Sequence, residues 1–230
     1  MSERVNQVWH GIEPHPEFQV LFVRHAESQI NIMPELEIPR HALPPDSGVT
    51  YPLTPKGMRQ ARVLGERLSS ENLSAVYTST RMRCIQTATA IALPHEMLVT
   101  QVEDMVEIAF TDPAASMGMI EEGEVRTMMA RWAAGDIDAA APGGGESLRE
   151  VYQRFLPAAS ELIAKHARQP GNLVLVAHGG VLAAGLTQLF ANVSPAFALS
   201  HMFDNTATAT GKLIDGSLVC TDWHGNLPFD

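Results

Sequence analysis

Long apolar runs are missing from this chain of 230 residues. No segment approaches the roughly 20 consecutive apolar residues that a membrane-spanning helix needs. The first stretch, Met1 to Phe18, also lacks the basic-then-apolar order of a secretory signal. The sequence therefore predicts a soluble, cytoplasmic protein with no membrane segment.

Cysteine and basic charge are scarce as well. Cys84 and Cys220 are the two cysteines, so the chain has neither a C-x-x-C pair nor a disulfide framework. We expect two ordinary, partly buried thiols. Sixteen basic residues stand against 26 acidic ones, a net charge of −10. Because nucleic-acid affinity comes largely from Lys and Arg that neutralise phosphates, we expect no nucleic-acid partner. A small, local positive pocket remains compatible with this balance.

Short apolar runs and helical periodicity alternate along the chain, and hydrophobic residues make up 45% of it. Such alternation predicts an α/β fold: a three-layer sandwich with a mostly parallel central sheet and helices on both faces. Thr54 and Pro55 are typical of a helix start, and Asp215-Gly216 of a hairpin turn. We expect strands at 19–23, 74–79 and in 172–180, two or three short strands near the C-terminus, and helices at 55–69, 81–92, 121–134 and from 146 onward.

Two segments break this alternation. Residues 32–52 are rich in proline without periodicity, and a loop of that length is often functional, so we place it at the rim of a site. Residues 105–145 are acidic and rich in methionine. We therefore predict a single domain over 1–230, with a cap-like insertion at about 104–145.

Cationic and titratable residues follow three of the predicted strands. Arg24 and His25 end the first strand, Arg83 comes shortly after the second, and His178 ends the strand in 172–180. Since ligands of parallel sheets bind at the carboxyl ends of strands, these groups should meet at one edge.

Two arginines and two histidines suit a phosphoryl group. Arginine binds phosphate oxygens with two parallel hydrogen bonds and stays charged. Neutral imidazole is a nucleophile near pH 7 and can carry phosphate covalently. A second histidine could stabilise the charge on the transferring oxygens. The segment HAESQIN, 25–31, is expected to open a turn or helix whose free N–H groups add to anion binding.

Four sequence blocks then occur in a recognisable order. They are RHAESQIN (24–31), LTPKGMRQA (53–61), STRMRCIQTA (79–88) and VLVAHGG (174–180). With these blocks the sequence resembles the histidine phosphatase superfamily, the phosphoglycerate mutase-like proteins. The resemblance implies a phosphoric monoester hydrolase that acts on a small phosphorylated molecule and needs no metal or other cofactor.

The resemblance also implies roles for individual residues. His25 would be the nucleophile that accepts the phosphoryl group. The remaining catalytic groups of the phosphate pocket would be Arg24, Arg83 and His178, and the substrate-binding residues Asn31, Ser28 and Gly179.

A carboxylate from the insertion would complete the site. Glu107 is the expected proton donor to the leaving oxygen and the later base for water. Asp104 is the reserve candidate for that role. The region around Asn205 also matches the family, more loosely.

Some positions depart from the family pattern. Ala26 replaces the usual glycine, and its N–H should remain accessible if its φ is negative. Mutases of the family carry Glu-Arg-x-Tyr-Gly at the acid, where this chain has EIAFT (107–111), and a tryptophan where it has Ile30. These differences favour phosphomonoester hydrolysis through phosphohistidine over mutase-type phosphoryl transfer, which remains the alternative.

Two readings from other classes stay open. AASMG (114–118) loosely resembles the elbow of a serine hydrolase with Ser116 as nucleophile, although no buried strand precedes it. A regulatory protein with an inactive pocket is the other reading, and the presence of His25, Arg83 and His178 argues against it. Neither the physiological substrate nor the oligomeric state follows from the sequence.

Overall fold

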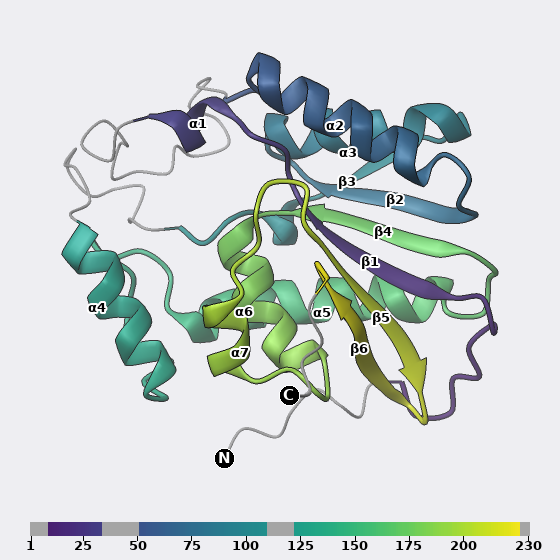
Figure 1. Ribbon diagram of the computed structural model, residues 1–230. Helices are drawn as coiled ribbons and strands as arrows, with labels where there is room; N and C mark the ends of the chain where they lie inside the picture. Colours follow the sequence, from purple (N-terminus) through teal and green to yellow (C-terminus); the bar gives the residue numbers. More distant parts are fainter. Residues whose placement is uncertain (1–8, 34–50, 110–121, 226–230) are drawn as a thin grey trace.

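A central sheet forms the middle layer of the molecule (Figure 1). The computed structural model describes residues 9–33, 51–109 and 122–225. Within these ranges the sheet has six strands in the order β3-β2-β4-β1-β5-β6. The strands are β1 (Gln19–Arg24), β2 (Leu73–Ser79), β3 (Val99–Val102), β4 (Asn172–Ala177), β5 (Thr208–Ile214) and β6 (Ser217–Trp223).

The four strands β1 to β4 are parallel, and β5 and β6 add an antiparallel hairpin next to β1. The predicted strands at 19–23, 74–79 and in 172–180 are confirmed as β1, β2 and β4. Asp215 and Gly216 form the hairpin turn, with φ values of 49° and 75°. The sequence pattern missed β3, because this strand of four residues lies at the sheet edge and is only half-buried.

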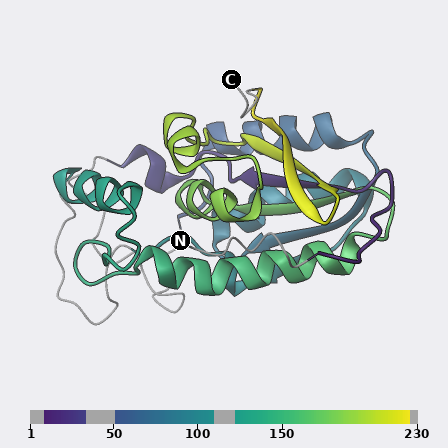
Figure 2. The same cartoon turned by 90° about the horizontal axis from the view of Figure 1, so that it is seen from below.

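Alternate residues of β1 face two separate cores. Val20 and Phe22 belong to the core that α5 (Leu148–His166) and α6 (Gly179–Leu189) cover. Leu21 and Val23 belong to the core under α2 (Pro55–Leu68) and α3 (Met82–Ala92). Figure 2 shows α2 and α5 on opposite sides of the sheet. The three-layer α/β prediction is confirmed, and the mostly parallel order holds except at the β5–β6 edge.

The predicted helices are confirmed as α2, α3, α5 and α4 (Glu122–Ala133). At the start of α2, Thr54 Oγ1 accepts a hydrogen bond from Gly57 N (3.0 Å). At the start of α5, Ser147 and Glu150 form a capping box, with Ser147 N donating to Glu150 Oε2 (2.7 Å). The remaining helices are α1 (Gln29–Ile32), α7 (Pro195–Ser200) and the 3₁₀ turns η3 (Leu93–His95) and η4 (Glu103–Met105).

The insertion between β3 and α5 carries α4, which lies beyond the carboxyl ends of the parallel strands (Figure 1). Its function as a cap stays a prediction. The serine-hydrolase motif at 114–118 and most of the proline-rich loop at 32–52 fall outside the described residues. Among the helices of the described ranges, none is long and apolar enough to cross a membrane.

Candidate active site

The carboxyl ends of β1 and β4 place two histidines side by side. Arg24 is the register partner of Ala177, and His25 N donates to Ala177 O (3.0 Å). His25 and His178 are therefore the residues that directly follow two paired strands. Their ring centroids are 5.2 Å apart. We call these two residues the active-site histidines.

Arg83, from the first turn of α3, bridges the two rings. Its Nε donates to His25 Nε2 (3.2 Å), and its Nη2 lies 3.0 Å from His178 Nδ1. Since arginine only donates, both of these ring nitrogens must accept. The second nitrogens then carry the protons: His25 Nδ1 donates to Ala26 O (2.7 Å) and His178 Nε2 to Ser79 Oγ (2.9 Å). This tautomer leaves the lone pair of His25 Nε2 in the site.

Burial keeps both rings neutral. His25 is 3% exposed and His178 is fully buried. Burial, with the adjacent positive charge of Arg83 as the next cause, lowers the pKa of each imidazole well below its usual range. An imidazole must be unprotonated to attack phosphorus, so the surroundings favour the reactive form at neutral pH.

Arg24 adds a second cation with an open donor. Its Nη1 donates to Phe203 O. Its buried Nε has no hydrogen-bond partner within the described ranges. A Cβ added at Gly179 would lie 3.2 Å from this Nε, so glycine there leaves space beside the open N–H. Because an unsatisfied buried donor is costly, Arg24 Nε is suited to an anion that enters the site.

The segment after His25 opens a short helix, α1, as expected. Four backbone N–H groups of this segment are already hydrogen-bonded within the protein, and anion binding by the segment stays a prediction. Ala26 does have a negative φ, as the expectation required. The folded chain supplies an acceptor for the N–H of each residue from 26 to 29. Ala26 N donates to Thr87 Oγ1 (3.1 Å), Glu27 N to Gln60 Oε1 (2.9 Å), Ser28 N to Asn31 Oδ1 (2.9 Å) and Gln29 N to Pro52 O (3.0 Å).

These acceptors explain two of the sequence blocks. Gln60 comes from the LTPKGMRQA block and Thr87 from the STRMRCIQTA block, and both hold the backbone that follows His25. Glu27 is tied to the start of α2, where Thr54 Oγ1 donates to its Oε1 (2.8 Å) and Lys56 Nζ to its Oε2 (2.6 Å). The sequence had assigned no function to Gln60 or Thr87. The sequence signal for this supporting function was the presence, in both blocks, of polar side chains that can accept a hydrogen bond and that had no catalytic function assigned to them.

Asn31 and Asn205 lie next to each other at the rim. Asn205 Nδ2 donates to His25 O (3.0 Å) and lies 3.4 Å from Asn31 Oδ1. Ser28 is fully buried, and its hydroxyl donates to Asn31 Oδ1 (3.0 Å). The substrate-binding functions of Asn31, Ser28 and Gly179 stay predictions.

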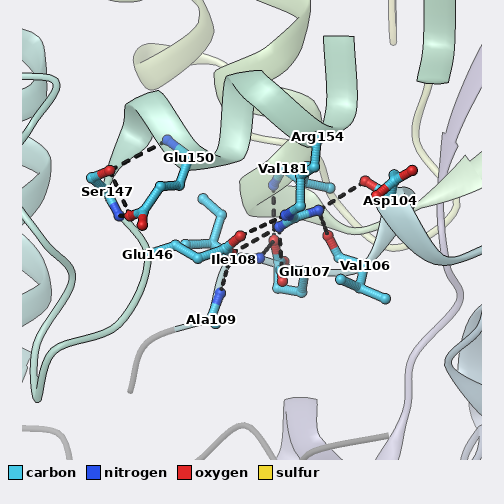
Figure 3. A network of polar contacts seen from close by, with 10 residues as sticks. All are labelled: Asp104, Val106, Glu107, Ile108, Ala109, Glu146, Ser147, Glu150, Arg154 and Val181. Atoms are coloured by element: carbon cyan, nitrogen blue, oxygen red, sulfur yellow. Dashed lines mark hydrogen bonds and ion pairs between the residues drawn. The ribbon is translucent and has the colours of Figure 1, made fainter. Parts of the chain in front are cut away.

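Glu107 contacts the first turn of α6 (Figure 3), the helix that begins directly after His178. Its carboxylate accepts from Gly180 N (3.1 Å), Val181 N (2.8 Å) and Ile108 N (3.0 Å). The side chain of Asp104 is exposed and, with α5 residues, lines a surface groove of about 610 Å³. The fold thus brings Glu107, rather than the reserve candidate Asp104, to the first turn of α6, which directly follows His178.

Known proteins share this fold and sequence pattern. A family model described as the histidine phosphatase superfamily (branch 1) matches residues 20–224. Phosphoglycerate mutase-like protein 4 from Arabidopsis thaliana is 30% identical over 203 residues, which are 86% of this chain and 80% of that protein. Phosphoserine phosphatase 1 from Hydrogenobacter thermophilus is 30% identical over 163 residues, 70% of each protein. A solved phosphoserine phosphatase mutant from Entamoeba histolytica, in complex with phosphoserine, has a TM-score of 0.70 at 19% identity, over 92% of this chain and 99% of that one.

The family match runs from β1 to the end of β6, so the chain belongs to the histidine phosphatase superfamily. The resemblance found in the four sequence blocks is confirmed. So is the prediction of a phosphoric monoester hydrolase.

Proposed function

We propose that the protein hydrolyses small phosphomonoesters in the cytoplasm through a phosphohistidine on His25, without a metal ion. One observation carries the proposal: Arg83 bridges two buried, neutral histidines and leaves Nε2 of His25 as the acceptor nitrogen. An arginine that binds a phosphate there would present phosphorus to that nitrogen.

In the first step, Arg24 Nε and Arg83 bind the phosphate oxygens, and His178 supports their charge. His25 Nε2 attacks phosphorus, the N–P bond forms and the ester P–O bond breaks. Glu107 gives its proton to the departing alcohol oxygen. The contact between His25 Nδ1 and Ala26 O keeps the ring oriented throughout.

In the second step, water replaces the alcohol. Glu107, now ionised, accepts a proton from the water while the water oxygen attacks phosphorus. The N–P bond breaks, inorganic phosphate leaves, and His25 returns to its neutral form. A mutase would share the first step and pass the phosphoryl group to a substrate hydroxyl. The phosphatase and phosphoserine names among the similar proteins make phosphoserine the first substrate to test.

The test is phosphate release from an aryl phosphate in EDTA, with wild type, His25→Ala and His10→Ala as a surface control. We expect wild-type activity that EDTA leaves unchanged, a loss of at least about 10³-fold in His25→Ala, and no loss in the control. Vanadate should inhibit, and a fluorophosphonate directed at serine should not label the protein. Equal activity of wild type and His25→Ala would refute the phosphohistidine.

Should the wild type release no phosphate, a phosphoglycerate mutase assay with a bisphosphorylated primer distinguishes the alternative. Activity there, lost in His25→Ala, would show transfer to a second substrate instead of water.

A further inference from the structure

Arg154, on α5, contacts the backbone that carries Glu107 (Figure 3). Its Nη1 donates to the carbonyl oxygens of Asp104 (2.8 Å) and Val106 (2.9 Å). Its Nη2 donates to Glu107 O (3.2 Å). Three carbonyls of one irregular segment thus share a single guanidinium.

Glu146 orients that guanidinium. Its Oε1 accepts from Arg154 Nε (2.6 Å) and its Oε2 from Arg154 Nη2 (2.9 Å). All five N–H donors of Arg154 are therefore used, a pattern that lysine cannot reproduce. The two side chains are only 16% and 21% exposed. Such a pair is screened much less than a surface ion pair.

The same pair joins the two ends of the insertion. Glu146 Oε2 also accepts from Ala109 N (2.8 Å), and Glu146 N donates to Ala109 O (2.8 Å). Residues 104–109 begin the insertion, and Glu146 ends it immediately before the N-cap of α5. One cluster therefore holds the chain on both sides of Glu107, while the carboxylate itself contacts α6.

We infer that Arg154 is a positioning residue for proton transfer. With Glu146 it holds the backbone of Glu107, so that the carboxylate stays on the first turn of α6, directly after His178. This inference rests on the proposed function, in which Glu107 protonates the leaving oxygen. Arg154 itself touches no reacting atom.

A loss of positioning has a kinetic signature that depends on the leaving group. A phenolate such as p-nitrophenolate departs without a proton, whereas an alkyl alcohol needs one from Glu107. General acid catalysis is worth about 10²–10⁴-fold, and a misplacement of about 1 Å can cost about 10²-fold. The penalty should therefore fall on alkyl phosphates. A general loss of folding would affect both substrates equally.

The experiment compares kcat/KM for p-nitrophenyl phosphate and phosphoserine in Arg154→Met, Arg154→Lys and Glu146→Gln. The matched control is Arg149→Met on the same helix. Arg149 Nη2 pairs with Asp138 Oδ2 (2.9 Å), and the side chains of Arg149 and Asp138 are 50% and 67% exposed. We expect Arg154→Met to lose at least about 10²-fold on phosphoserine and less than about 10-fold on the aryl ester. Arg154→Lys should lose less, and the control should match wild type on both.

Loss of a buried ion-pair partner can prevent folding, so thermal unfolding of each variant is measured in parallel. If Arg154→Met does not fold, Glu146→Gln decides, because it keeps the side-chain shape but removes the carboxylate that orients the guanidinium. The larger loss on phosphoserine is expected in this variant too. Equal losses on the two substrates, or losses no larger than in Arg149→Met, would overturn the inference. Glu107→Gln separates the two proposals. If it shows no leaving-group dependence, Glu107 is not the acid, and both fail; if only Arg154→Met lacks the dependence, the positioning inference alone fails.

Discussion

Replacement of Arg83 by methionine tests the centre of the site most directly. Arg83 is 8% exposed and donates to both active-site histidines, over 3.2 and 3.0 Å. Methionine fills a similar length of space without charge or donors. The substitution therefore removes phosphate binding and leaves the sheet and helices in place.

The loss of activity follows from the number of donors removed. One preorganised donor at a site of developing charge is worth about 10²–10³ in kcat. In the proposed mechanism Arg83 donates two such hydrogen bonds to the incoming phosphate. We therefore expect kcat/KM to fall by at least about 10³-fold, equivalent to about 4 kcal/mol. The positive charge of Arg83 also lowers the pKa of His25, so the acid limb of any residual activity should move to higher pH.

Stability should change in the opposite direction. Without substrate, Arg83 is a buried cation beside Arg24 and two neutral rings, an arrangement that serves binding at the expense of the folded state. Arg83→Met should unfold at the same temperature as wild type or higher. Inorganic phosphate should raise the unfolding temperature of wild type and not that of the variant.

Steady-state kinetics and thermal unfolding, each with and without phosphate, measure these effects. Arg81→Met is the matched control, because Arg81 is the half-buried N-cap residue of α3 and donates to neither histidine. We expect it to keep activity within about 10-fold of wild type. The reasoning is refuted if both variants lose activity alike, or if the loss in Arg83→Met follows from a lower unfolding temperature.

Three further predictions follow from burial and packing. Burial and the neighbouring arginines hold the active-site histidines unprotonated in the folded state, so the unfolded state binds more protons below about pH 6.5. The free energy of unfolding should therefore fall by about 1.4 kcal/mol per pH unit for each histidine as pH drops. Urea titrations between about pH 6.5 and 5 check this, and a flat profile contradicts it. Burial raises the pKa of Cys84 and of Cys220 to about 12. Iodoacetamide at pH 8 should therefore label neither thiol until urea is added. Labelling of the native protein would count against the fold around the two cysteines. A Cβ at Gly57 would lie 1.8 Å from Glu27 O, so Gly57→Ala should lose about 1–3 kcal/mol of stability together with activity. A Cβ at Gly123 has no neighbour within 4 Å, so the control Gly123→Ala should keep both stability and activity.

The main strands and helices could be predicted because their signals are local. The apolar run of β4 is buried at every position, and Thr54 and Ser147 cap the helices that they precede. β3 was not predicted because its four residues, two exposed and two half-buried at the sheet edge, carry no strong periodicity. The short α7 was likewise not predicted.

Part of the candidate site could also be predicted from the sequence. A strand that ends in Arg-His or His-Gly-Gly places those side chains at the carboxyl edge, whatever the rest of the fold does. The sequence did not show that N–H groups after His25 are already bonded within the protein, for a tertiary reason: Thr87 and Gln60, which accept two of them, lie 61 and 33 residues away along the chain. No local sequence pattern shows whether the fold will bring such an acceptor next to these N–H groups.

The sequence by itself determined the α/β class, the family and the proposed site residues, because each depends on periodicity or on short blocks. The tertiary structure decided how those residues act. Arg83 meets His178 across 95 positions, and that contact selects the tautomer of the ring. Arg154 meets the carbonyl of Glu107 across 47 positions. Such contacts form only when separate helices and strands pack together, so the proposed nucleophile could be predicted from the sequence and the residues that orient it could not.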